Sequence, residues 1–127
     1  MKTTDTIYNQ HRENTTFMEK LFFYRDEIAI MKSRIAEIAS KNSSNEVMVQ
    51  VEQFQNQLII QDNNIDMIKH DVGQSEKSLE AAINKNETAV DHRKVEDHLA
   101  AREGVNSFEK NFNELREELK RFLAKWM

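Results

Sequence analysis

The loop Lys41-Asn42-Ser43-Ser44-Asn45 decides how this chain folds, because it separates two long segments that contain almost no helix breakers. Asn and Ser disfavour helix interiors, since their short side chains hydrogen-bond the nearby backbone. A second loop is predicted at Asn84-Lys85-Asn86-Glu87. The remaining segments, about 5–41, 44–83 and 88–126, would form helices roughly 55–60 Å long at a rise of about 1.5 Å per residue.

The rest of the chain lacks the residues from which turns are made. Its 127 residues include two glycines and no proline, whereas average usage would give about 9 and 6. A β-sandwich or an α/β fold needs far more turns than this. The sequence therefore predicts an all-α fold, a long antiparallel up-down-up three-helix bundle that forms a single domain over residues 1–127. A break at Gly73 would instead give a four-element bundle.

Apolar residues recur at alternating steps of three and four along each segment. These core lines run from Ile7 to Ile38, from Val47 to Leu79 and from Val95 to Trp126, a spacing typical of coiled-coil-like packing. With short loops, residue n of the first helix should face residues near 86 − n of the second and n + 85 of the third, to within a turn either way.

Two local contacts follow from these patterns. Ser43 and Glu46 have the spacing of a capping box, which would start the second helix. Tyr24 and Gln61 lie on facing core lines at matching levels, and a hydrogen bond between them would help to fix the register.

Charge and composition exclude several classes of function. The net charge of −4 gives no basic field for nucleic acid. The absence of cysteine rules out disulfides, thiolate catalysis and Cys-ligated zinc. No window approaches the roughly 18 apolar residues of a membrane span, and the first residues do not have the pattern of a signal peptide. We therefore expect a cytoplasmic protein that binds neither nucleic acid nor membranes.

The predicted register gathers every histidine of the chain near one end of the bundle, although they come from three helices. Helical bundles hold transition metals with histidines and carboxylates that project inward. The candidate ligands for Fe, Mn or Zn are His11, His70, His92, Glu96 and His98. The chain contains neither the Glu-x-x-His pairs of ferritin-like di-iron bundles nor a His-Glu-x-x-His motif. The alternative is that these are polar residues near a loop, with no cofactor at all.

Enzymatic function is not expected. General acid–base catalysis by the same histidines and carboxylates would need a pocket, and a narrow three-helix bundle rarely provides one.

A further group of apolar residues lies off the core lines. They are Phe22, Phe23, Ile30, Ile59, Ile60, Met67, Leu99 and Leu123. They could widen the core stripe of each helix or form a second apolar face for another subunit or a helical partner. We expect the second, and hence a non-enzymatic protein that acts through protein–protein interaction or self-association. A metal-binding bundle is the alternative.

The last third of the chain carries a family resemblance. The segments Asp91-His92-Arg93 and Asp97-His98, the ending Phe108–Met127 and, more weakly, His11-Arg12-Glu13-Asn14 resemble small uncharacterised bacterial helical-bundle proteins. The resemblance implies a cytoplasmic all-helical protein and carries no activity with it.

Overall fold

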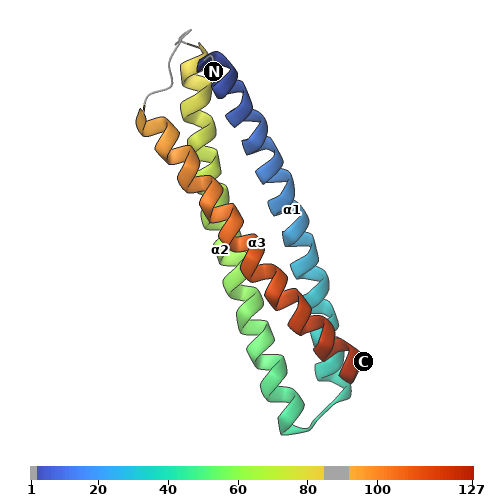
Figure 1. Cartoon of the computed structure of the whole chain (residues 1–127). Coiled ribbons are helices and arrows are strands. Elements are labelled where there is room, and N and C mark those ends of the chain that lie inside the picture. Colours follow the sequence, from blue (N-terminus) through green and yellow to red (C-terminus); the bar gives the residue numbers. More distant parts are fainter. Residues whose placement is uncertain (1–2, 85–91) are drawn as a thin grey trace.

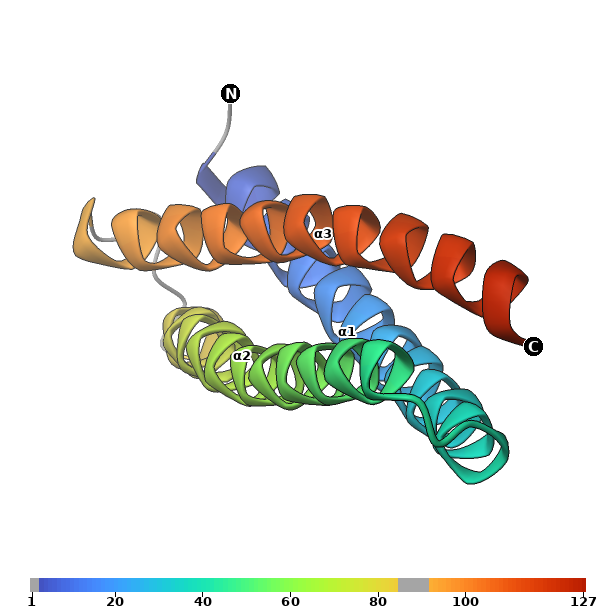
Figure 2. The ribbon, with the colours of Figure 1, turned by 90° about the horizontal axis from the view of Figure 1, so that it is seen from below.

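Three long helices make up the structure. The computed structural model describes residues 3–84 and 92–127, with side chains for 7–84 and 97–127. The helices are α1 (Thr3–Lys41), α2 (Asn45–Asn84) and α3 (His92–Trp126), and successive helices run in opposite directions, down, up and down in the view of Figure 1. Viewed from below, their axes are clearly inclined to one another (Figure 2). The predicted all-α three-helix bundle is confirmed.

The second helix is continuous. Helix α2 passes through Gly73 without a break, so the four-element alternative is not adopted. The predicted bounds of the first two helices agree with the structure within a few residues. Of the predicted third helix, residues 88–91 lie outside the described part of the chain.

The Asn42 loop closes one helix and opens the next. Asn42 donates hydrogen bonds to the carbonyl oxygen of Ile38 from both its backbone N (3.1 Å) and its Nδ2 (2.9 Å). Helix α2 is capped by Ser44, whose Oγ accepts a hydrogen bond from the backbone N of Val47 at 3.4 Å. The predicted cap at Ser43 is therefore wrong by one residue. Ser44 stands three residues before Val47 and so meets the free N–H groups of the first turn.

The predicted register is confirmed by contacts between the helices. Polar contacts join α1 to α3 at offsets of 85 to 89 residues, as in Glu13–His98 and Glu27–Arg116, and Arg25 of α1 pairs with Asp62 of α2.

The predicted Tyr24–Gln61 bond does not form. The Tyr24 hydroxyl donates instead to Glu109 Oε2 of α3 at 2.8 Å. Burial of the phenol and this hydrogen bond to a carboxylate raise the pKa of Tyr24 to about 12.

The interior changes character along the bundle. From Leu21 and Ile65 toward the Asn42 loop, one continuous apolar cluster fills the space between the helices, with Phe112 and Leu119 at its centre. Toward the other end the apolar clusters become small. The core line there is occupied by buried polar side chains, namely Gln10, Asn14, Ser75 and His98.

None of the helices that the structure describes has a stretch long and apolar enough to cross a membrane.

Candidate functional site

His98 is the centre of the polar end of the bundle. It lies on the core line of α3, its ring is fully buried, and it stacks against Phe17 with ring centroids 6.3 Å apart. Both ring nitrogens are engaged. Nε2 lies 2.6 Å from Glu13 Oε1, and Nδ1 lies 3.2 Å from Ser75 Oγ. His98 therefore links all three helices through its ring.

Glu13 and Arg102 complete one side of this network. Arg102 Nε donates to Glu13 Oε1 at 2.8 Å, so this oxygen is shared between the guanidinium and the His98 ring. Burial acts to raise the pKa of Glu13, but hydrogen bonds from Arg102 and His98, together with their positive charges, lower the pKa below its ordinary value of 4.5. The carboxylate is thus held in its charged form.

Asn14 extends the network toward α2. Its Nδ2 lies 3.4 Å from Ser75 Oγ and 3.1 Å from Glu76 Oε2, to both of which it can donate. Glu76 also pairs with His11 Nδ1. The resulting chain of contacts runs from Arg102 on α3, through Glu13, His98, Ser75, Asn14 and Glu76, to His11 on α1. We call this the polar network.

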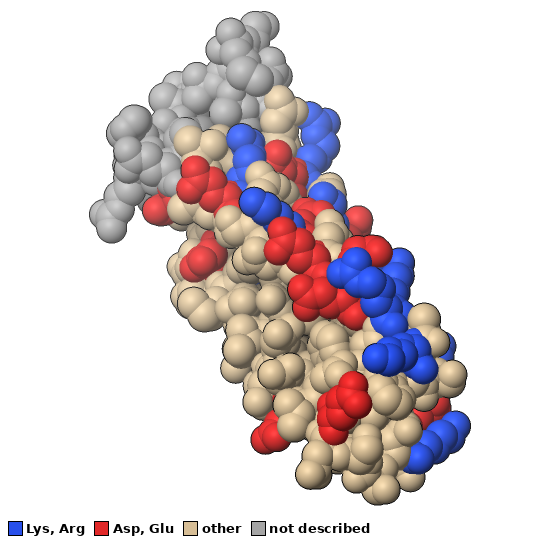
Figure 3. All heavy atoms as spheres, turned by 60° about the horizontal axis from the view of Figure 1, so that its bottom comes forward, with Lys and Arg blue, Asp and Glu red and all other residues tan. Residues whose placement is uncertain are grey.

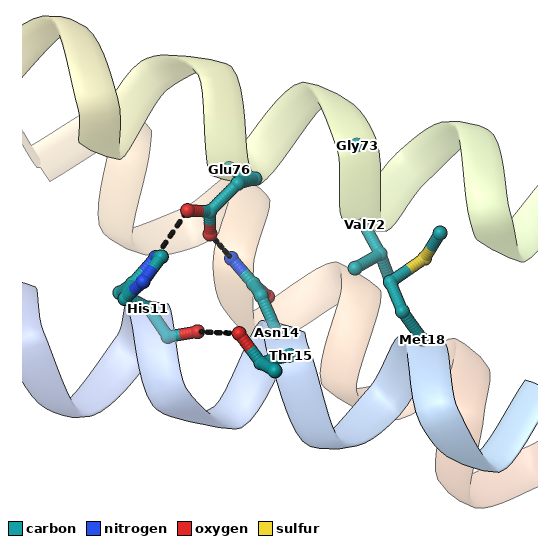
Figure 4. Close-up of a pocket in the computed structure, with 7 residues that line it drawn as sticks. All are labelled: His11, Asn14, Thr15, Met18, Val72, Gly73 and Glu76. Carbon is teal, nitrogen blue, oxygen red and sulfur yellow. Dashed lines mark hydrogen bonds and ion pairs between the residues drawn. The ribbon is translucent and has the colours of Figure 1, made fainter.

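A cavity of about 340 Å³ opens between α1 and α2 beside the network. His11, Asn14 and Glu76 form its polar wall, whereas Met18 and Val72 lie at its apolar end (Figure 4). Gly73 borders the same space, and a Cβ added there would meet no atom within 4 Å.

The order of groups in the network, hydroxyl, imidazole and carboxylate, is that of a nucleophile activated by a base. The Ser75 side chain is nevertheless only 1% exposed, and His98 is fully buried. No substrate can reach this hydroxyl in the observed conformation. The arrangement gives the buried side chains of His98 and Ser75 hydrogen-bond partners and joins the helices, as polar groups in a core require.

The predicted metal ligands occupy different surroundings. His11 pairs with Glu76 at the α1–α2 boundary, whereas His98 bonds to Glu13 and Ser75 inside the bundle. His70 is exposed. The side chains of His92 and Glu96 lie outside those the structure describes. Within the described residues, no group of three or more His, Asp or Glu side chains is arranged to hold a metal ion.

Arg102 is the member of the network that the sequence patterns miss. It lies four residues after His98, one turn further along the same side of α3. The register rule places it one turn beyond the position opposite Glu13, and this spacing was the available signal. From the sequence alone, an arginine on a helix rich in charged residues is expected to be a solvated side chain.

The structure divides the apolar residues that lie off the core lines into one buried residue and a larger exposed group. Leu123 packs against the main core. The other members of the group are exposed, with between 44% and 66% of their surface accessible, namely Phe22, Phe23, Ile30, Ile59, Ile60, Met67 and Leu99. Phe22 is partly shielded by Lys69, whose Nζ lies 4.8 Å from the ring centroid.

Charges on the surface are mixed in sign. On the face shown in Figure 3, acidic and basic side chains lie side by side, and its lower part carries few charges. This pattern gives no extended basic patch on that face.

Comparison with known proteins adds no relative: no family model, no curated protein and no solved structure matches this chain.

Proposed function

We propose that this protein is a non-enzymatic, cytoplasmic helical bundle that acts by binding other helices, in the first place by self-association. The observation that carries the proposal is the exposure of large apolar side chains that the core does not use. Ile60 and Met67 on α2 are 54% and 66% exposed, and Phe23 on α1 is 61% exposed.

The core does not need these residues. Each helix already fills the interior from its core line, and the central side chains Leu58, Ile65 and Phe112 are fully buried. Single exposed apolar residues are ordinary on a protein surface. Several on the same helix, at the spacing of one helical face, are typical of a surface that is covered by a partner.

The compartment is part of the proposal. A chain without cysteine has no disulfide to form and so no need of an oxidising environment.

Sedimentation equilibrium tests self-association directly. The chain without an affinity tag is measured from micromolar to millimolar concentration, and the average mass is expected to rise from that of the monomer toward that of a dimer. A mass that stays at the monomer value over the whole range would overturn the proposal of self-association.

A transition-metal site is the alternative function. Its support is the polar wall of the cavity, where His11 and Glu76 meet beside Asn14. Elemental analysis of dialysed, tag-free protein decides between the two. Stoichiometric Fe, Mn or Zn that is lost in His11→Ala or His98→Ala would establish a metal site, and its absence would leave interaction as the function.

A further inference from the structure

Helix α2 carries a second regular line of residues on the side away from the core. Its members follow one another in alternating steps of four and three, and all are exposed. They are Val49, Gln53, Asn56, Ile60, Asn63, Met67, His70 and Gln74. We call this line the outer stripe of α2. Such steps keep residues on one face of a helix over many turns, as a second helix lying alongside requires.

The outer stripe contains no Asp, Glu, Lys or Arg. The corresponding outer lines of the other two helices are interrupted by exposed charges. On α1, Asp26 lies between Phe23 and Ile30. On α3 the charged positions are Glu103, Lys110 and Glu117. The α2 face therefore differs from the other two in charge as well as in apolar content.

This difference selects the surface on which a second copy can dock. Each copy carries a net charge of −4, so a contact that also brought acidic groups together would add to the repulsion between the two copies. Burying an unpaired charge at an interface is also costly. The outer stripe can be buried without meeting either cost.

We propose that two copies of this chain pair through the outer stripes of α2 in antiparallel orientation, about a two-fold axis near Leu58 and Ile59. The inference rests on the proposed self-association and specifies its surface and geometry. A two-fold axis makes every contact occur twice. An antiparallel pair also opposes the two helix dipoles.

The register follows from the order of residues in the stripe. With the axis near Leu58, Val49 of one copy meets Met67 of the other, and Gln53 meets Asn63. At these positions apolar side chains face apolar ones and amides face amides that can hydrogen-bond to them, whereas beside the axis Ile60 of each copy packs against Asn56 of the other. A parallel pair would instead place every residue of the stripe against its own copy, His70 against His70 included, and would set the two helix dipoles side by side in the same direction, which is unfavourable.

The acidic residue at the edge of the stripe is accommodated in this register. Glu52 would approach Asp66 of the second copy, but Asp66 is already paired with Arg25, whose Nη2 lies 2.6 Å from Asp66 Oδ1. The positive charge of Arg25 offsets the two carboxylates at that edge.

The overlap is long enough for two helices to pair. From Val49 to Met67, the part of the stripe that faces its copy in this register extends about 27 Å at the rise of an α-helix. A standard interface buries roughly 800 Å² per partner, which is about a tenth of the 8122 Å² surface of this chain. With only Val49, Ile60 and Met67 apolar in the stripe, the dimer is expected to be reversible.

Cysteine crosslinking tests the orientation and the register, because the natural chain has no cysteine. The double variant Val49→Cys/Met67→Cys is expected to form a covalent dimer under mild oxidation. The single variants Val49→Cys and Met67→Cys should crosslink no more than Ile30→Cys on α1. Efficient crosslinking of a single variant would overturn the antiparallel arrangement in favour of a parallel one.

A charge substitution tests the surface separately. Ile60→Lys is expected to raise the dissociation constant of the dimer about tenfold or more, since two lysines would be buried about the axis. Ile30→Lys, on the equally exposed outer line of α1, is the matched control and should leave the constant unchanged. Circular dichroism checks that both variants remain helical.

These experiments distinguish a wrong docking surface from the absence of self-association. A dimer that persists in Ile60→Lys and in which the double cysteine variant does not crosslink would overturn the α2 surface and leave self-association standing. A natural chain that stays monomeric would overturn both.

Discussion

The two halves of this bundle have the same backbone geometry and opposite chemistry. Near the Asn42 loop, the core line is filled by side chains such as Ile35 and Leu119, which bury apolar surface and form no polar contacts. Near the other end the same positions hold Asn14, Ser75 and His98. The spacing of the core positions is therefore enough to form a bundle, and the side chains at those positions decide whether each half is held together by apolar packing or by polar contacts.

This difference indicates which half of the bundle supplies its stability and which half fixes the register of its helices. Apolar burial is non-directional and tolerates small displacements along a helix. Hydrogen bonds do not, because they require donor and acceptor within about 3 Å in the correct direction. His98 is satisfied only where Glu13 and Ser75 are both in reach. We infer that the apolar half supplies most of the stability and that the polar half selects one alignment of the helices.

The largest effect is expected from a cavity in the apolar half. Phe112 is fully buried, with its ring centroid 5.0 Å from that of Tyr24 and 5.5 Å from that of Phe108. Phe112→Ala should lower the free energy of unfolding by about 3–5 kcal/mol in urea denaturation. Phe23→Ala, which removes a ring that is 61% exposed, should change it by no more than about 0.5 kcal/mol. Equal losses in the two variants would contradict this division of the core.

A smaller loss is expected from the polar half. His98→Ala removes a buried ring and takes one hydrogen-bond partner from each of Glu13 and Ser75, which should cost about 1–3 kcal/mol. His70→Ala removes an exposed histidine from α2 and is the matched control, with an expected change within about 0.5 kcal/mol. Unfolding midpoints of the two variants at neutral pH provide the measurement. If His98→Ala proved as harmless as His70→Ala, the polar network would have no role in folding.

Both glycines of the chain lie toward the polar half, and there a gain in stability is expected. A Cβ at Gly73 would meet no atom within 4 Å, and one at Gly104 would lie 3.7 Å from Ile68 Cγ1, an ordinary contact. Gly73→Ala should therefore stabilise the protein by about 1 kcal/mol, because alanine loses less conformational entropy in a helix. Thermal unfolding would show this as a higher midpoint for Gly73→Ala, and Gly104→Ala should behave similarly. A lower midpoint in Gly73→Ala would show that the open space is needed.

The fold was predictable because its signals are long and redundant. Steps of three and four continue over whole helices, and a cluster of polar residues marks the loop at Asn42, whereas the second predicted loop, after Asn84, lies outside the described residues. An error of one residue in predicting a single helix end or cap therefore does not change the predicted fold. The cap of α2 illustrates this, since Ser44 takes the place predicted for Ser43 and the helix still begins where expected.

The contacts of the site were predictable only in part, because a register known to one turn leaves about 5.4 Å of uncertainty. That margin is enough to gather His11 and His98 near one end of the bundle. It is too coarse to choose hydrogen-bond partners, which must lie within about 3 Å. Tyr24 illustrates the limit, since its hydroxyl reaches Glu109 on α3 and not Gln61 on α2.

The smallest expected effect is on how the free energy of unfolding changes at acidic pH. Because the pKa of Glu13 is lower in the folded protein than its ordinary value of 4.5, its carboxylate stabilises the fold above that pH. This contribution is lost as the pH falls through the folded-state pKa. Glu13→Gln should therefore be less stable than the natural chain at pH 6, and the difference should shrink below pH 4.5. Urea denaturation at a series of pH values measures it.

Glu37→Gln is the matched control, because Glu37 is an exposed carboxylate on the same helix. Its difference from the natural chain should be small at every pH. A Glu13→Gln difference that stayed constant into acid would mean that the Glu13 side chain acts through shape alone. The charge of the Glu13 carboxylate, held between Arg102 and His98, would then not be what distinguishes the polar half from the apolar one.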